Sequence, residues 1–202
     1  MFFDTKFNNH NLPFNPFKAC VVPRPIGWIS SVDKNGIVNL APYSYFNAVA
    51  DIPPIIMFAS GYNLDGSIKD SQRNIEATGE FVVNIASYDL RDLMNLSSSP
   101  LAHGVSEVDS FAIETEASTL VKPPRVKAAH ISLECKYIKN ILLEVEGENA
   151  SSQIVLGHVV GIYIQDEVLT DGKVDIAKLR PIARLGYNEY AVIEKVFKMK
   201  RP

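Results

Sequence analysis

The stretch 24-RPIGWISSVDKNGIVNLAPYSYFN-47 decides how the fold of this chain is interpreted. Residues 26–32 and 37–41 have the composition of two strands, and Asn35-Gly36 between them supplies the positive φ angles that a hairpin turn needs. The return strand, which we expect to resume at 43–49, runs through APYSYFN, a run of hydroxyls, aromatic rings and an amide. A strand that only fills a core does not need these groups, whereas a strand beside a flat ligand with polar edges does.

The rest of the chain predicts further strands and two helices. The strands are expected at 18–22, 55–60, 81–86, 130–146 and 152–164, with a turn at 147–151, and the helices at 68–78 and 88–96. The apolar run 55–60 has the length of a central strand that is covered on both faces. Because strands outnumber helices and follow one another closely, we predict an antiparallel barrel with peripheral helices.

One domain across residues 1–202 is the simplest organisation. Residues 1–17 are aromatic, rich in Asn and broken by Pro, which is typical of an arm that packs on something. Residues 97–128 form a Ser-rich, then acidic excursion in which we expect one short helix. Gly79 follows the first predicted helix directly, at the position where a left-handed residue ends a helix.

Composition excludes several classes of protein. A net charge of −3 argues against a nucleic-acid surface, which would carry a basic field. No stretch approaches the ~20 apolar residues of a membrane span, and the N-terminus lacks the apolar region of a signal peptide. Cys20 and Cys135 are far apart and outside any C-x-x-C motif, so we expect no disulfide framework and expect each to be a small buried side chain in a reducing compartment. The predicted location is the cytoplasm.

Common catalytic motifs are absent from the sequence. It contains neither G-x-x-x-x-G-K-[ST] nor G-x-G-x-x-G, so neither common phosphate loop is present. The four histidines lack the spacing of metal ligands, and no pair of carboxylates stands out. We therefore expect no metal site and no catalytic side chain.

A candidate anion site begins at KDSQR, residues 69–73. This segment opens a predicted helix, and Lys69 and Arg73 are four residues apart, so we expect their side chains to be neighbours on one helix face. A helix N-terminus offers unpaired N–H groups, and Ser71 adds a hydroxyl, which together suit a phosphate. The alternative is a solvated helix face, and Asp70 opposes an anion there unless it caps the helix or pairs with Arg73.

The polar run offers candidate ligand contacts on both faces of a strand. With regular pairing, Tyr43, Tyr45 and Asn47 lie on one face, and Ser44 and Phe46 lie on the other. The aromatic rings could equally belong to a core or an interface. Ser60 ends the next strand, and Trp28, the only tryptophan, is more often a packing residue.

Several segments together resemble the flavin reductase-like proteins of the FMN-binding split-barrel fold. These segments are RPIGWISSVDKNGIVNLAPYSYFNAVADIPPIIMFAS from residue 24, KDSQRNIEATGEFVVNIA from 69, LECK from 133, GHVVGIYIQDEVL from 157 and RPIARLGYNEY from 180. They span residues 20–190. The resemblance implies a mainly β, six-stranded antiparallel Greek-key split barrel with peripheral helices. It also implies a homodimer that binds FMN non-covalently near its interface.

The resemblance assigns a set of residues to the cofactor. The segment 39–47 would lie along the isoalloxazine and ribityl chain, and Ser60 with 69–73 would hold the phosphate. The assigned residues are Trp28, Asn39, Ala41, Pro42, Tyr43, Ser44, Tyr45, Asn47, Ser60, Lys69, Ser71 and Arg73. Arg24 and Arg184 are the candidates for a basic group beside the flavin ring, and His130 could border the site.

The implied activity is NAD(P)H-dependent reduction of flavin or a small acceptor through FMN. A nicotinamide would bind over the flavin, which supplies the chemistry. The alternatives are an electron carrier with tightly held FMN and a protein partner, or a flavin-binding dimer without redox turnover. The chain departs from the resemblance by lacking a Pro in 128-AAHIS-132 and by carrying Tyr187 where a Gly is common, which puts substrate choice in doubt.

Overall fold

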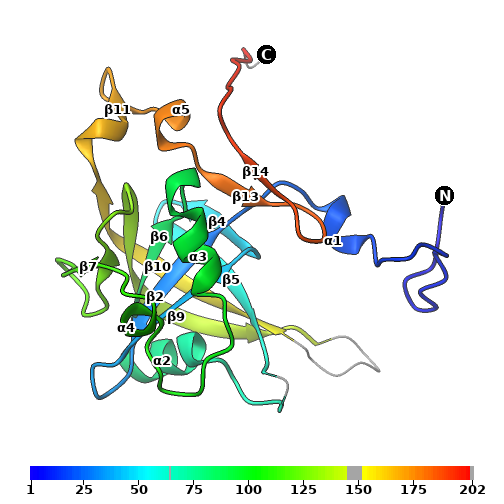
Figure 1. The fold of residues 1–202 in the computed structure, drawn as a ribbon, viewed down its shortest axis with the longest axis horizontal. Coiled ribbons are helices and arrows are strands. Elements are labelled where there is room, and N and C mark those ends of the chain that lie inside the picture. Colours follow the sequence, from blue (N-terminus) through cyan, green and yellow to red (C-terminus); the bar gives the residue numbers. More distant parts are fainter. Residues whose placement is uncertain (64, 145–151, 201–202) are drawn as a thin grey trace.

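The computed structural model describes residues 1–63, 65–144 and 152–200 (Figure 1). Its main sheet has seven antiparallel strands in the order β3-β2-β6-β9-β10-β5-β4. Their bounds are β2 Gly27–Val32, β3 Val38–Tyr43, β4 Phe46–Asp51, β5 Pro54–Gly61, β6 Glu80–Ile85, β9 Ile131–Leu142 and β10 Ser152–Ile164. The predicted mainly β, antiparallel fold is confirmed.

The connection between β3 and β4 explains how the sheet curls. These strands are the two edges of the sheet, yet only Ser44 and Tyr45 separate them in sequence. Two residues span only a few ångströms of chain, so the sheet must bend until its edges lie side by side. The sheet has seven strands where the resemblance implied six, because the bend at Ser44-Tyr45 divides one path into β3 and β4.

Shorter elements surround the barrel. The helices are α1 Phe17–Cys20, α2 Asp70–Thr78, η1 Tyr88–Leu90, α3 Arg91–Leu96, α4 Glu107–Ser110, η2 Asp166–Val168 and α5 Ile176–Leu179. The small sheets are β1 Arg24–Pro25 with β13 Ile182–Arg184 and β14 Tyr190–Val192, β7 Thr115–Glu116 with β8 Arg125–Val126, and β11 Leu169–Thr170 with β12 Lys173–Val174. In Figure 1, α1 lies beside the chain that joins β13 to β14, and the N-terminal arm extends away from the barrel.

Strand β2 is buried on both faces, and the prediction of a doubly covered strand at 55–60 was wrong. All six residues of β2 are buried, and its alternate side chains enter different core clusters: Trp28 joins one and Ile29 the other. In β5, by contrast, Ile56 and Phe58 are buried while their neighbours are half exposed. The outward face of β5 is therefore open, although its sequence is apolar throughout.

Three local predictions near the N-terminus need correction. Cys20 was expected to be buried, but it is exposed, whereas Cys135 is buried as expected. Residues 18–22 were expected to be a strand, but α1 occupies most of them, because the Pro16 carbonyl accepts from the amides of Ala19 and Cys20. In the hairpin, Gly36 alone takes a positive φ, of 88°. Asn35 does not, because the Asp33 carboxylate accepts from the amides of Asn35 and Ile37 and holds a different turn.

The predicted helices are confirmed. α2 ends at Gly79, which is left-handed with φ 74° and donates its N–H to the Ile75 carbonyl. η1 and α3 together cover the helix expected at 88–96. The excursion at 97–128 contains the short helix α4 and also the β7–β8 pair, and the turn expected at 147–151 lies outside the described residues.

None of the helices in the described part of the chain is both long and apolar enough to cross a membrane.

Candidate functional site

A buried polar cluster lies where α2 meets β3 and the end of β5. The Ser71 hydroxyl, in the first turn of α2, donates to Asn39 Oδ1 on β3 at 2.6 Å. Ser60 is 1% exposed at the end of β5, and Asn39 is 8% exposed. Three of the predicted phosphate and ribityl residues, far apart in sequence, are therefore brought toward one place.

Glu107 completes this cluster from the excursion. Asn39 Nδ2 donates to both carboxylate oxygens at 3.0 and 2.9 Å, and the Leu40 amide donates to one of them at 2.9 Å. Burial raises the pKa of Glu107, and the hydrogen bonds from Leu40 and Asn39 oppose that rise. Sequence reasoning missed Glu107, because 68 residues separate it from Asn39 and no motif links them.

Tyr43 supplies a hydrogen-bonding group without a partner. Its side chain is 7% exposed, and its hydroxyl has no hydrogen bond within the structure. Burial raises the pKa of Tyr43, while the hydroxyls of Ser71 and Ser60 beside it oppose the rise, so the phenol stays protonated. Lys69 Nζ lies 5.9 Å from the centre of the Tyr43 ring. A buried O–H donor and a cation thus face the same cluster.

The N-terminus of α2 has no side-chain cap. Its N-cap, Lys69, makes no capping hydrogen bond. The Ser67 hydroxyl, two residues before Lys69, donates to Asp65 at 2.6 Å and does not cap the helix. The amides of the first turn therefore keep the donor capacity that an anion could use.

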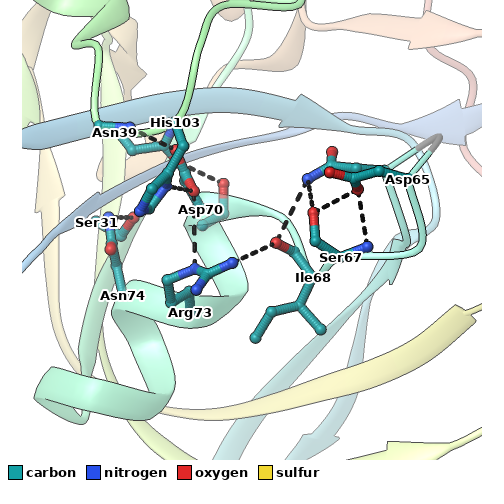
Figure 2. A network of polar contacts seen from close by, with 12 residues as sticks. Ser31, Asn39, Asp65, Ser67, Ile68, Asp70, Arg73, Asn74 and His103 are labelled. Atoms are coloured by element: carbon teal, nitrogen blue, oxygen red, sulfur yellow. Dashed lines mark hydrogen bonds and ion pairs between the residues drawn. The ribbon is translucent and has the colours of Figure 1, made fainter.

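Three groups contact the Asp70 carboxylate, and Figure 2 shows two of them, His103 and Arg73. His103 Nδ1 lies 2.5 Å from Asp70 Oδ1, and the Gly104 amide donates to Oδ2 at 3.1 Å. Arg73 Nε lies 3.9 Å from the same carboxylate. The expected pairing of Asp70 with Arg73 is present, and His103, which sequence reasoning missed, is the closer partner.

Lys69 and Arg73 do not share one helix face, contrary to the prediction. Lys69 is extended and precedes the helix, and its side chain lies over Tyr43. Arg73 is exposed and donates to the Ile68 carbonyl at 3.4 Å (Figure 2). Lys69 is therefore the better placed of the two for the cluster.

The run after β3 does not continue as a regular strand. The bend at Ser44 turns Tyr43 and Phe46 into the same core cluster and leaves Tyr45 40% exposed, 5.7 Å from the Arg24 guanidinium. Asn47 is exposed, and its Oδ1 accepts from the Ala48 amide. The expected common face for Tyr43, Tyr45 and Asn47 was therefore wrong.

A cavity of about 680 Å³ lies on the other side of β3. Pro42, Ser44 and Tyr45 line it, whereas Ala41 packs against the core cluster of Tyr43. Arg24 and Arg184, the two predicted basic candidates, also line this cavity. The remaining lining residues are Phe14, Asn15, Phe17, Lys18, Ile26, Met94, Asn95, Ser98, Leu185, Tyr187 and Tyr190.

Trp28 and His130 belong neither to the polar cluster around Asn39 nor to the lining of the cavity. Trp28 is fully buried in a core cluster and donates from Nε1 to the Ser97 hydroxyl at 2.8 Å. His130 is half buried just before β9 and does not line the cavity. The assignment of Trp28 to the cofactor stays a prediction, and its surroundings are those of a packing residue.

No group of three or more His, Cys, Asp or Glu side chains within the described ranges is placed to hold a metal ion.

Comparison with known proteins gives consistent matches. The family model described as "Flavin reductase like domain" matches residues 19–181. A protein of Aquifex aeolicus is 37% identical over 171 residues, which are 84% of each chain. Nitrilotriacetate monooxygenase component B from Bacillus cereus is 29% identical with a TM-score of 0.90 and covers 98% of both chains. The 2-nitrobenzoate 2-nitroreductase of Pseudomonas fluorescens is 26% identical with a TM-score of 0.85 and covers 100% of this chain and 96% of its own.

Proposed function

The chain belongs to the flavin reductase-like family, and we propose that it is an FMN-dependent oxidoreductase of the cytoplasm, with its cofactor site in a single domain. The family match and the monooxygenase component and nitroreductase among its structural neighbours support a flavin-related oxidoreductase. Bound FMN would supply the chemistry, by accepting a hydride from NADH or NADPH and passing electrons to flavin or a small acceptor.

The observation that carries the proposal is the buried, unpartnered hydroxyl of Tyr43. A buried polar group without a hydrogen bond costs about 1–3 kcal/mol, and an acceptor supplied by a ligand beside Tyr43 would remove that cost. The hydroxyls of Ser60 and Ser71 lie beside it, Lys69 adds a positive charge, and the uncapped start of α2 adds amide donors. A phosphate is the acceptor that fits this donor set.

Glu107 and Asn39 position this donor set. The Glu107 carboxylate fixes the Asn39 amide, and the Asn39 carbonyl oxygen in turn accepts from Ser71. Because both partners are buried, Ser71 is held in one place before any ligand arrives. Neither Glu107 nor Asn39 needs to exchange a proton in this role.

The isoalloxazine would lie along 41–44, beside the cavity. Arg184 is half buried there and carries a charge that would favour a reduced, anionic ring. Arg24 is the weaker candidate, because its guanidinium already donates to the carbonyls of Lys18, Val21 and Leu185.

A homodimer is part of the proposal. Large apolar side chains remain exposed on β4, β9 and β10, which together with β5 form the end β9-β10-β5-β4 of the main sheet. These side chains are Val49, Ile138, Ile141, Leu142 and Ile162. Exposed apolar groups on adjacent strands mark an interaction surface. Ile141→Glu should shift the sedimentation coefficient toward that of a monomer, and Ile37→Glu in the exposed hairpin should not.

The test of function is the visible spectrum of the purified protein during anaerobic titration with NADH and NADPH. A flavin spectrum that bleaches with either nucleotide is the expected result and gives the preference. A flavin spectrum that neither nucleotide bleaches would move the assignment to an electron carrier. Failure to take up added FMN would overturn the proposal.

A further inference from the structure

The cavity beside β3 combines three positive charges with no acid. Lys18, Arg24 and Arg184 line it, and its lining contains neither Asp nor Glu. None of the three forms an ion pair within the described residues. The chain has a net charge of −3, whereas the lining of this cavity is positively charged. Such a pocket attracts anions.

The arginines bond only to neutral groups. Arg24, which is 6% exposed, donates to three carbonyls, at 2.6 Å for Val21 and 2.8 Å for Leu185. Arg184 donates to the Tyr190 hydroxyl and the Tyr187 carbonyl. These contacts fix both side chains in place but leave their charges uncompensated, as a site for an anion requires.

Aromatic rings form much of the remaining wall, and two of them, Phe14 and Phe17, come from the N-terminal arm. Phe14 meets Tyr187 edge to face, with ring centres 5.7 Å apart. Gly186 allows this docking, because a Cβ there would lie 2.5 Å from the Ala19 Cβ. The end of the arm from Phe14 onward, together with α1, therefore lies close against the turn after β13 and forms one side of the cavity.

We propose that this cavity binds a planar aromatic carboxylate as a second ligand, beside the flavin of the proposed function on which this inference rests. Its volume of about 680 Å³ suits a small molecule. Rings such as Phe14, Tyr45 and Tyr187 offer flat faces to an aromatic body, and the guanidinium of Arg184 matches a carboxylate. Tyr187 and the arm thus become determinants of ligand choice.

Calorimetric titration of the FMN-loaded protein with benzoate and with benzamide tests the charge. Benzoate is expected to bind at least about tenfold more tightly, because one charge-assisted contact is worth roughly that much. Arg184→Gln should remove this difference and Arg184→Lys should keep most of it. Lys173→Gln, an exposed cation of β12 outside this cavity, is the control and should change nothing. Equal binding of the two compounds by the wild type would overturn the proposal.

A second pair of variants tests the arm. Phe14→Ala should weaken benzoate binding severalfold without loss of FMN, and Phe7→Ala, an equally exposed ring of the arm, should not. Release of FMN by benzoate would also overturn the proposal, because it would give the cavity to the flavin ring itself. If the protein takes up no FMN, the proposed function fails. The same benzoate titrations of the wild type and the variants then still show whether the cavity binds an aromatic carboxylate.

Discussion

Replacing Lys69 and Arg73 separately tests where the phosphate lies. Lys69 is half buried and lies over the Tyr43 ring, whereas the Arg73 side chain is 45% exposed and contacts the Ile68 carbonyl and Asp70. A charge-assisted hydrogen bond in a partly buried site contributes roughly 1.5–3 kcal/mol, which is about 10- to 150-fold in affinity. An exposed ion pair contributes about 0.2–1 kcal/mol, at most about fivefold. Lys69→Ala should therefore weaken FMN binding far more than Arg73→Ala.

Fluorescence titration with FMN and with riboflavin gives the measurement. Riboflavin has the same ring and ribityl chain but no phosphate, so Lys69→Ala should leave its affinity nearly unchanged. The double variant should resemble Lys69→Ala, because the Arg73 contribution is small. Equal losses for FMN and riboflavin would show that Lys69 acts on the fold or the ring, and would refute the phosphate assignment. A larger loss from Arg73→Ala than from Lys69→Ala would refute the placement of the anion beside Tyr43.

Four further substitutions test the packing of the barrel and the site by urea unfolding. Burial raises the pKa of Glu107 above its usual 4.5, so the contribution of Glu107 to the free energy of unfolding is present below pH 4.5 and is lost as the pH rises through the raised pKa. Glu107→Gln should abolish this pH dependence. If stability depends on pH in the same way in the variant and the wild type, the raised pKa of Glu107 is not its cause. Gly157→Ala would place a methyl group 2.3 Å from the Phe81 ring and should cost about 1–3 kcal/mol, whereas Gly161→Ala meets its nearest atom at 3.2 Å and should cost less. Trp28→Phe removes a buried N–H donor and should lower the free energy of unfolding by about 1–3 kcal/mol without changing FMN affinity; a selective loss of FMN would instead assign Trp28 to the cofactor.

The sequence predicts the elements that depend on local chemistry. Gly79 ends α2 because a left-handed residue is needed there, and the apolar runs at 81–86 and 152–164 form strands in the sheet. Composition alone does not tell how many faces of a strand are covered. The prediction therefore gave two covered faces to 55–60, which has one open face, and missed β2, which is buried on both faces although it contains two serines.

The parts of the site that escaped prediction depend on contacts between distant segments. Glu107 and His103 come from the excursion and bond to Asn39 and Asp70, and no spacing rule connects them. The bend at Ser44 also has no local signal. It follows from closure of the barrel, because β3 and β4 lie at opposite edges of one sheet although only two residues join them.

The position of β3 at the sheet edge accounts for the unusual run APYSYFN. Alternate residues of the strand face opposite sides, so Asn39 and Tyr43 point to the polar cluster, and Pro42, followed by Ser44, lines the cavity. An edge strand also leaves one row of main-chain donors and acceptors without a strand partner, and the Leu40 amide already uses this freedom to bond Glu107. A flat ligand with a polar edge that lay along β3 could therefore meet the main chain directly, with its phosphate on one side and its ring on the other. A strand in the middle of the sheet could not offer this, because its backbone groups would already be paired.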